Sequence, residues 1–210
     1  MHYLNSATLS EHLNHTFITL IPKKKNPDFA FEFRPISLCN VLYKIFSKVL
    51  ANRLKKILPN IITENQSAFT KSCLISNNIL VAFESLHSMQ KYTGKEGYMA
   101  IKLDMSKAYD GVEWSYLQSF MEKMGFIEHW INLMMLCVKT MTYSILVNGE
   151  PKGMITPSSG IRQGDPFSPF LFLLCTEGLN GLINKAAHQL YIKGYSLYRN
   201  SPRLDRKSVV

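Results

Sequence analysis

Two aspartates stand close together in the stretch from Met99 to Asp110, near the middle of the chain. The stretch begins with alternating apolar and polar residues, which is typical of a half-buried β-strand, and Asp104 comes where the alternation ends. A carboxylate at the end of a strand suits a hard cation such as Mg²⁺, which takes oxygen ligands. Asp110 is predicted instead to cap a helix at residues 112–124, with Glu113 as its capping-box partner. Asp104 is therefore the candidate metal ligand, although a solvated turn explains this stretch alone at least as well.

The stretch from Gly160 to Pro169, with the sequence GIRQGDPFSP, strengthens the interpretation of Asp104. Together with residues 99–110 it resembles motifs A and B of a reverse transcriptase, specifically of the LINE-type (non-LTR) retrotransposons of plants. Residues 33–38 (FRPISL) and 66–69 (QSAF) resemble two earlier motifs of that family and stand in the family's order. Four motifs in order are far more specific than any one of them, and the resemblance covers the chain from about residue 13 to residue 204.

The resemblance implies an RNA-directed DNA polymerase, in which a primer 3′-hydroxyl attacks the α-phosphate of a deoxynucleoside triphosphate. Such a transfer uses two metal ions, Mg²⁺ in this family, held about 3.5–4 Å apart by carboxylates. The motif A aspartate of the family matches Asp104, and the backbone carbonyl of Met105 is the expected neighbouring ligand. The other carboxylates of the family come from a Tyr/Phe-Ala-Asp-Asp hairpin, and no Asp-Asp pair occurs in this sequence. We therefore expect a chain truncated before that hairpin and inactive by itself.

The resemblance also implies contacts with the RNA template, the DNA primer and the incoming nucleotide. Tyr109 matches the aromatic residue that excludes a ribose 2′-hydroxyl, although a merely packed aromatic is the alternative. Arg34 can offer paired donors to a phosphate or serve as an ion-pair partner. Lys71 stands where relatives have a Gly-Arg pair, and its ammonium lacks the planar fork of arginine. The predicted nucleotide-binding residues are Arg34, Tyr109, Gln163 and Gly164, and the predicted nucleic-acid-binding residues are Lys23, Lys24, Lys71 and Arg162. Asp165 is predicted to be a turn or cap residue.

The composition agrees with a partner that carries negative charge. The chain has 210 residues, 46% of them hydrophobic, which is enough for one domain or part of one. Its formal net charge of +9 favours polyanions, although a merely basic soluble protein would have the same balance. The cysteines form no Cys-x-x-Cys pair and predict buried free thiols in a reducing compartment; they are Cys39, Cys73, Cys137 and Cys175. No apolar run is long enough to span a bilayer, and no signal-peptide pattern is present. We expect an intracellular protein, with nucleus or cytoplasm left open.

Local signals in the first half predict the elements that position these residues. Residues 16–21 form a β-branched strand, and residues 22–27 form a basic turn. Asn40 caps an amphipathic helix that ends at Pro59, and Ser76 caps a second helix. The residues expected to face inward are Leu42, Ile45, Phe46, Val49 and Leu50 in the first helix and Ile79, Leu80, Phe83 and Leu86 in the second.

The second half is equally patterned. Gly125 is the predicted stop of the helix at residues 112–124. Asn148-Gly149 is the predicted turn of a β-hairpin. A last helix begins at Ser168 and runs to about Gln189. Residues 191–204 are expected to form a strand pair around Gly194. A further core-facing helix is indicated by Trp130, Leu133, Met134, Cys137 and Met141.

The predicted fold class is α+β: the fingers and an incomplete palm of a right-hand polymerase, with a small antiparallel sheet packed on helices and no thumb. Residues 1–12 are uninformative, residues 13–204 form the reverse transcriptase domain, and residues 205–210 depart from the family pattern as a candidate sequence artefact. Two alternatives stay open. One is a catalytically dead remnant that binds nucleic acid, and the other is a polymerase like the group II intron maturases or telomerase.

Overall fold

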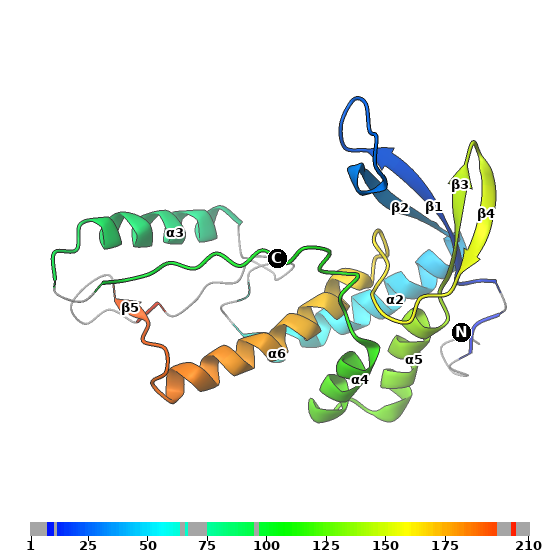
Figure 1. The fold of residues 1–210 in the computed structure, drawn as a ribbon. Helices are drawn as coiled ribbons and strands as arrows, with labels where there is room; N and C mark the ends of the chain where they lie inside the picture. Colours follow the sequence, from blue (N-terminus) through cyan, green and yellow to red (C-terminus); the bar gives the residue numbers. More distant parts are fainter. Residues whose placement is uncertain are drawn as a thin grey trace. The chain divides into compact units, whose positions relative to one another are not determined.

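The computed structural model of the protein describes residues 8–10, 12–63, 66, 75–94, 97–196 and 203–204. Residues 67–74, which include Lys71 and Cys73, and the predicted tail at 205–210 lie outside the described residues. The chain divides into two compact units (Figure 1). Unit 1 comprises Met1–Lys56 and Lys107–Cys175, and unit 2 comprises Ile57–Ser106 and Thr176–Val210.

Unit 1 contains a four-stranded sheet in the order β2-β1-β3-β4 (Figure 1). The strands are β1 (His15–Pro22), β2 (Phe33–Cys39), β3 (Thr142–Val147) and β4 (Glu150–Ile155). β1 pairs antiparallel with β2 but parallel with β3, so the sheet is mixed and the prediction of an antiparallel sheet is wrong. The parallel pair joins strands that are far apart in the chain, and no local turn signal announces such a pairing.

The predicted hairpin at the edge of this sheet is confirmed. β3 and β4 pair antiparallel, with Val147 opposite Glu150. The two residues between them have positive φ angles, 53° at Asn148 and 83° at Gly149. A two-residue turn with both φ angles positive matches the right-handed twist of the strands, which is why Asn-Gly is favoured there.

Three helices of unit 1 begin and end largely where local signals predict. In α2 (Val41–Ile57) the cap is confirmed, because the Asn40 Oδ1 atom accepts the N–H of Leu42 at 2.8 Å. α4 (Trp114–Lys123) is followed after its C-cap by Gly125, whose φ of 78° is left-handed. The N–H groups of Gly125 and Phe126 turn back onto carbonyls of the last helical turn, which is a Schellman stop. α5 (Glu128–Lys139) follows.

The predicted role of Asp110 is wrong. The N-cap residue of α4 is Glu113, and no side chain caps the helix there. Asp110 lies in the preceding turn, where its N–H donates to the carbonyl of Lys107 at 2.9 Å.

The core of unit 1 is built from one side of each helix. The methionine-rich stripe of α5 is buried as predicted, with Leu133, Met134 and Cys137 almost fully covered. In α2 the prediction is partly wrong, because Leu42 and Ile45 are 62% and 57% exposed. The buried side of α2 is centred about 100° further around the helix axis, on Tyr43, Phe46, Ser47, Leu50, Ala51 and Leu54.

α6 (Ser168–His188) begins at the predicted serine and runs from unit 1 into unit 2. Pro169 lies in its first turn, where a missing N–H costs no intrahelical hydrogen bond. Cys39 and Cys137 are buried free thiols and Cys175 is a half-buried one. Burial raises the pKa of Cys175 to about 12, so this thiol stays protonated and unreactive at neutral pH.

Unit 2 corrects three sequence predictions. α3 spans Ile75–Gln90, so Ser76 lies inside this helix and does not cap it. Its predicted inward residues are exposed, with Phe83 at 66%. The strand pair exists, but it is short: β5 (Tyr195–Ser196) pairs with β6 (Arg203–Leu204), so its turn does not lie at Gly194.

The predicted central strand at residues 99–103 is not present as a strand. Residues 97–105 have no regular secondary structure, and Met99, Ile101 and Leu103 are 77%, 68% and 72% exposed. Alternation gives a segment a face to bury, but a strand also needs a neighbour with which to share a hydrogen-bond ladder. Within the described part of the chain, no helix is long and apolar enough to cross a membrane.

Candidate active site

The turn at residues 107–112 and the loop at residues 160–164 are joined through their backbones in unit 1. The N–H of Gly160 donates to the carbonyl of Val112 at 2.7 Å. The carbonyl of Gly160 in turn accepts the indole N–H of Trp114 at 2.7 Å. These hydrogen bonds hold the end of the first candidate stretch against the start of the second, although about fifty residues separate them.

The contact requires a glycine at residue 160. Its φ is 87°, a left-handed conformation that side chains other than glycine rarely adopt. A Cβ atom built there would lie 3.2 Å from the Cα atom of Asp110 and 3.3 Å from the carbonyl oxygen of Tyr109. Both neighbours are backbone atoms, so neither can turn aside as a flexible side chain would.

We expect the Gly160→Ala variant to lose about 2 kcal/mol of unfolding free energy, from backbone strain and crowding together. Gly181→Ala is the matched control, because Gly181 lies within α6 and a Cβ there meets nothing within 4 Å. The control should be neutral or more stable by about 0.5–1 kcal/mol, since alanine is the better helix former. Chemical denaturation monitored by circular dichroism measures both. Equal stability of the two variants would contradict the close approach at Gly160.

Tyr109 lies where the turn at residues 107–112 is hydrogen-bonded to the loop at residues 160–164. Its carbonyl accepts the N–H of Ile161 at 2.9 Å, and its half-buried ring packs on Phe172 of α6 with 5.2 Å between centroids. Desolvation raises the pKa of the Tyr109 hydroxyl, so the ring stays neutral at physiological pH. One side of the ring therefore packs on Phe172 while part of the side chain remains accessible to solvent. This fits either a packing residue or a residue that excludes a ribose 2′-hydroxyl.

Gln163 and Gly164 form the exposed part of the second loop. The φ of Gly164 is 87°, and a Cβ there would lie 3.7 Å from the carbonyl oxygen of Ser37 on β2. The loop is thus tightly turned at Gly164 while Gln163 faces solvent. Because the carbonyl of Tyr109 accepts the N–H of Ile161, two residues before Gln163, the structure brings Tyr109 close to the loop of Gln163 and Gly164.

Arg162 does not face solvent, and the structure gives its predicted contact with nucleic acid no support. Its side chain is buried, with 3% of the residue exposed. One terminal nitrogen, Nη2, donates to the backbone carbonyl of Asn14 at 2.8 Å and to the Oδ1 atom of Asn14 at 2.7 Å. The guanidinium also lies 4.6 Å from the centre of the Tyr43 ring and 5.6 Å from that of Tyr143. The arginine supports the loop from inside the unit.

Asp165 completes this buried cluster and is a turn residue, as predicted. It accepts the hydroxyl of Tyr43 at 2.6 Å and the N–H of Phe167 at 2.9 Å. Burial and the neighbouring acidic groups, Cys137 and Asp165, raise the pKa of Tyr43 well above its ordinary value, so the phenol remains a donor. The residues on both sides of Gln163-Gly164 are therefore anchored, which fixes the loop between them.

Asp104 and Met105 belong to unit 2 and lie in the exposed irregular segment at residues 97–105. An exposed carboxylate with a neighbouring carbonyl fits one part of a hard-cation site. Two Mg²⁺ ions need more carboxylate oxygens than Asp104 supplies. Among the described residues, no three His, Cys, Asp or Glu side chains gather as a metal site.

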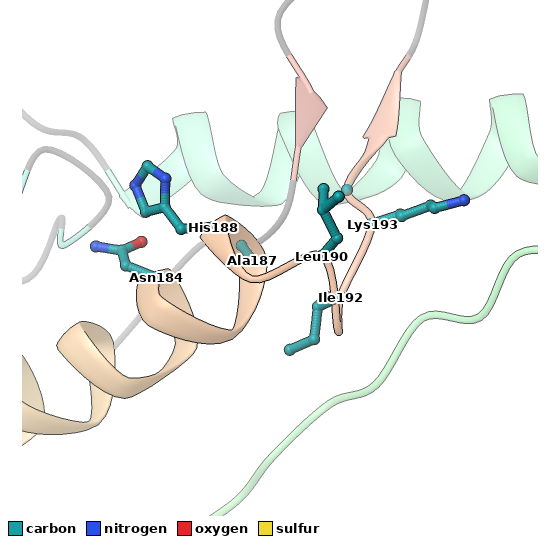
Figure 2. Close-up of a pocket in the computed structure, with 7 residues that line it drawn as sticks. Asn184, Ala187, His188, Leu190, Ile192 and Lys193 are labelled. Atoms are coloured by element: carbon teal, nitrogen blue, oxygen red, sulfur yellow. The ribbon is translucent and has the colours of Figure 1, made fainter.

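A pocket of about 220 Å³ lies in unit 2 at the end of α6 (Figure 2). It is lined by Asn184, Ala187, His188, Leu190, Ile192, Lys193 and Gly194. Figure 2 shows that Lys193 points away from His188, so the ammonium and the imidazole do not converge on one ligand. None of the predicted site residues lines this pocket.

Comparison with known proteins decides the family of this site. The family described as "Reverse transcriptase (RNA-dependent DNA polymerase)" matches the chain over residues 21–198. The chain belongs to the reverse transcriptase family. The matched region includes both segments joined at Gly160, whose sequences resemble motifs A and B of the family.

Relatives extend this assignment to retrotransposons. The chain is 29% identical over 178 residues to the "Retrovirus-related Pol polyprotein from type-1 retrotransposable element R2" of Popillia japonica, covering 80% of the chain and 24% of the relative. It is 27% identical over 176 residues to the "Transposon TX1 uncharacterized 149 kDa protein" of Xenopus laevis, covering 84% and 13%. An uncharacterized mitochondrial protein of Arabidopsis thaliana is 52% identical over 60 residues, covering 29% and 49%. The predicted relationship to non-LTR retrotransposons is confirmed, and the chain spans less than half of each relative.

The predicted basic contacts of this reverse transcriptase domain are mostly engaged within the chain. The Nζ atom of Lys23 donates to the carbonyl of Phe31 at 2.8 Å. Lys24 pairs with Glu32 at 2.6 Å, which lowers the pKa of that carboxyl. Arg34 is exposed on β2, and none of the ion pairs among the described residues involves it. Among the predicted cations that the structure describes, Arg34 is the best placed for a phosphate contact.

Sequence reasoning missed the residues that brace motifs A and B. Asn14, Tyr43 and Trp114 hold Arg162, Asp165 and Gly160 respectively. The first two are 148 and 122 residues from their partners, and no local pattern joins positions at such separations. Gly160 could have been found, because a glycine beside a turn is a standard signal of left-handed backbone.

Proposed function

We propose that the chain forms the fingers and part of the palm of an RNA-directed DNA polymerase from a non-LTR retrotransposon. This polymerase adds deoxynucleotides to the 3′-hydroxyl of a DNA primer paired with an RNA template. The observation that supports it best is the backbone joint between motifs A and B, which fixes Tyr109 and the loop of Gln163 and Gly164 in one unit. Residues 13–204 are the reverse transcriptase domain in this proposal.

Three residues of unit 1 position the incoming nucleotide in this proposal. Gln163 and Gly164 offer a side-chain amide and a backbone that a nucleotide can approach closely, because glycine has no Cβ. Arg34, exposed on β2, supplies paired donors to the triphosphate. Such positioning accounts for most of the protein's part in phosphoryl transfer, which needs little covalent chemistry from side chains.

Asp104 and the carbonyl of Met105 would hold Mg²⁺ in the same proposal. The ions supply a Lewis acid that neutralises the charge developing on the phosphate oxygens. Further carboxylates are required, and the chain contains no Asp-Asp pair to provide them. The 210-residue chain by itself is therefore expected to bind nucleic acid without incorporating nucleotides.

A primer-extension assay on an RNA template with Mg²⁺ tests the proposal. It compares this chain with the same chain extended through the genomic sequence that follows Leu204. We expect incorporation by the extended polypeptide alone. If the extended polypeptide binds RNA and incorporates nothing, the second candidate holds, a nucleic-acid-binding remnant. Incorporation by the short chain would contradict our account of the metal ligands.

Tyr109 provides a second test, on sugar discrimination. In the extended polypeptide, Tyr109→Val should raise kcat/KM for ribonucleotides relative to deoxynucleotides by about 10–100-fold, because the ring no longer meets the 2′-hydroxyl. Tyr109→Phe is the matched control, since it keeps the ring on Phe172 and should preserve discrimination. If Tyr109→Val lowers stability and leaves the ratio unchanged, Tyr109 is a packing residue only.

A further inference from the structure

The solvent side of α2 carries cations and no anions. The helix has the sequence VLYKIFSKVLANRLKKI, which contains five Lys or Arg residues and no Asp or Glu. All five cations are exposed; they are Lys44, Lys48, Arg53, Lys55 and Lys56. None of the ion pairs found among the described residues involves them. Their charge is therefore not neutralised by any ion pair in the described part of the chain.

Three of these lysines form a straight row. At 3.6 residues per turn, Lys44, Lys48 and Lys55 point within about 40° of one another around the helix axis. The rise of 1.5 Å per residue spreads them over about 16 Å. The buried residues Tyr43, Leu50 and Leu54 fix the rotation of the helix, so this row cannot turn inward. We call Lys44, Lys48 and Lys55 the α2 lysine row.

We propose that the α2 lysine row is a binding surface for the sugar–phosphate backbone of RNA. The inference rests on the proposed function, and it locates part of the nucleic acid on α2, outside the joint of motifs A and B. One strand of a duplex carries a phosphate every 3.4 Å or so of axis, so a 16 Å row spans about five phosphates. Contacts of this kind hold the strand without reading its sequence.

An anionic membrane surface is the competing partner, because exposed apolar residues accompany the lysines. Val41, Leu42 and Ile45 are 69%, 62% and 57% exposed. They lie within the first five residues of α2, whereas a helix that lies in a membrane interface needs an apolar face along its length. The other apolar side of α2 is already buried in unit 1. The charge row runs the length of the helix and the apolar patch does not, which favours a polyanion.

The test is fluorescence anisotropy with a labelled single-stranded RNA and the full 210-residue chain at several salt concentrations. The variant Lys44→Gln/Lys48→Gln/Lys55→Gln removes the row, and glutamine keeps helix propensity close to that of lysine. We expect the slope of log affinity against log salt to fall by about 2, since each single-strand contact contributes about 0.7. With equal affinities at 1 M salt, this difference in slope makes the variant bind RNA about 100-fold more weakly than wild type at 0.1 M salt.

Two matched variants separate the row from net charge and from folding. Lys123→Gln/Lys139→Gln/Lys152→Gln removes three exposed lysines elsewhere in unit 1 and should leave the salt slope nearly unchanged. Lys44→Arg/Lys48→Arg/Lys55→Arg keeps the charges and should keep wild-type affinity. Equal losses from both glutamine variants would overturn the proposal, because net charge alone would then explain binding.

Three further outcomes would also overturn it. If the triple glutamine variant of the row loses binding to vesicles of phosphatidylserine and phosphatidylcholine but binds RNA like wild type, the surface is a membrane site. If wild type does not bind RNA at all, the inference falls together with the proposed function. If the extended polypeptide extends primers but the row variant binds RNA like wild type, the inference alone is wrong.

Discussion

Replacing the buried Arg162 by alanine should lower the unfolding free energy by about 3–5 kcal/mol, the range for breaking a buried charged network. The variant loses both hydrogen bonds to Asn14 and the stacking on Tyr43. The Oδ1 acceptor of Asn14 is then left buried without its donor, which costs more than the lost bond itself, whereas the backbone carbonyl of Asn14 keeps the N–H of Thr142 at 3.4 Å. Burial alone lowers the pKa of Arg162, but Tyr43, Cys39, Tyr143 and Asp165 raise it, so the guanidinium is charged in wild type.

Urea denaturation of the 210-residue chain measures this loss, with Arg34→Ala as the control. Arg34 is an exposed arginine on β2 of the same unit, so its removal should change stability by less than about 0.5 kcal/mol. Arg162→Lys tests the geometry, because the shorter lysine loses the planar group stacked on Tyr43 and should recover only part of the stability. Two results together would show that Arg162 binds nucleic acid after all. Arg162→Ala would be as stable as wild type, and its slope of log RNA affinity against log salt would be smaller by the value of one contact.

The features that the sequence predicted well depend on residues close together in the chain. Asn148-Gly149 forces a tight turn between two strands, and Asn40 offers an acceptor to the first free N–H groups of α2. Gly125 lets the chain leave α4 through a left-handed residue. Each signal acts within about four residues, so it does not depend on tertiary contacts with the rest of the fold.

The features that could not be predicted depend on partners far along the chain. Residues 99–103 have the alternation of a strand, but a strand exists only with a neighbour, and pattern alone cannot provide one. Leu42 and Ile45 lie on a helix with two apolar sides, and only the tertiary packing decides which side is buried. Burial of a charged residue is rare, so Arg162 beside Gln163 was naturally expected on the surface.

The candidate site shows the same division. The resemblance to the family gave Tyr109, Gln163 and Gly164, and the structure brings these three into one unit. The close approach of Gly160 to Asp110 and the indole hydrogen bond of Trp114 brace them. A glycine beside a turn is a local signal, but the partners of both contacts have no pattern in the linear sequence. A motif thus predicts which groups do chemistry more readily than what holds them in place.

In the extended polypeptide, Asp104→Asn should lower kcat for nucleotide incorporation by at least about 10³-fold, or about 4 kcal/mol of activation free energy. Asparagine has nearly the same shape as aspartate but carries no charge, so the change removes a metal ligand and little packing. Asp104 is exposed, and therefore the substitution should leave the unfolding free energy within about 0.5 kcal/mol of wild type. Single-turnover primer extension separates this loss from any change in substrate binding.

Asp28→Asn is the matched control, because Asp28 is an exposed aspartate whose contact with Lys24 is long, at 3.7 Å. It should retain incorporation within a few-fold of wild type. RNA binding without Mg²⁺ should be the same for both variants, since the lysines of α2 and not Asp104 meet the backbone in our account. The Asp104 variant should also need more Mg²⁺ for half-maximal incorporation, because one ligand is missing. Full incorporation by Asp104→Asn at ordinary Mg²⁺ would mean that the metal ions are held elsewhere.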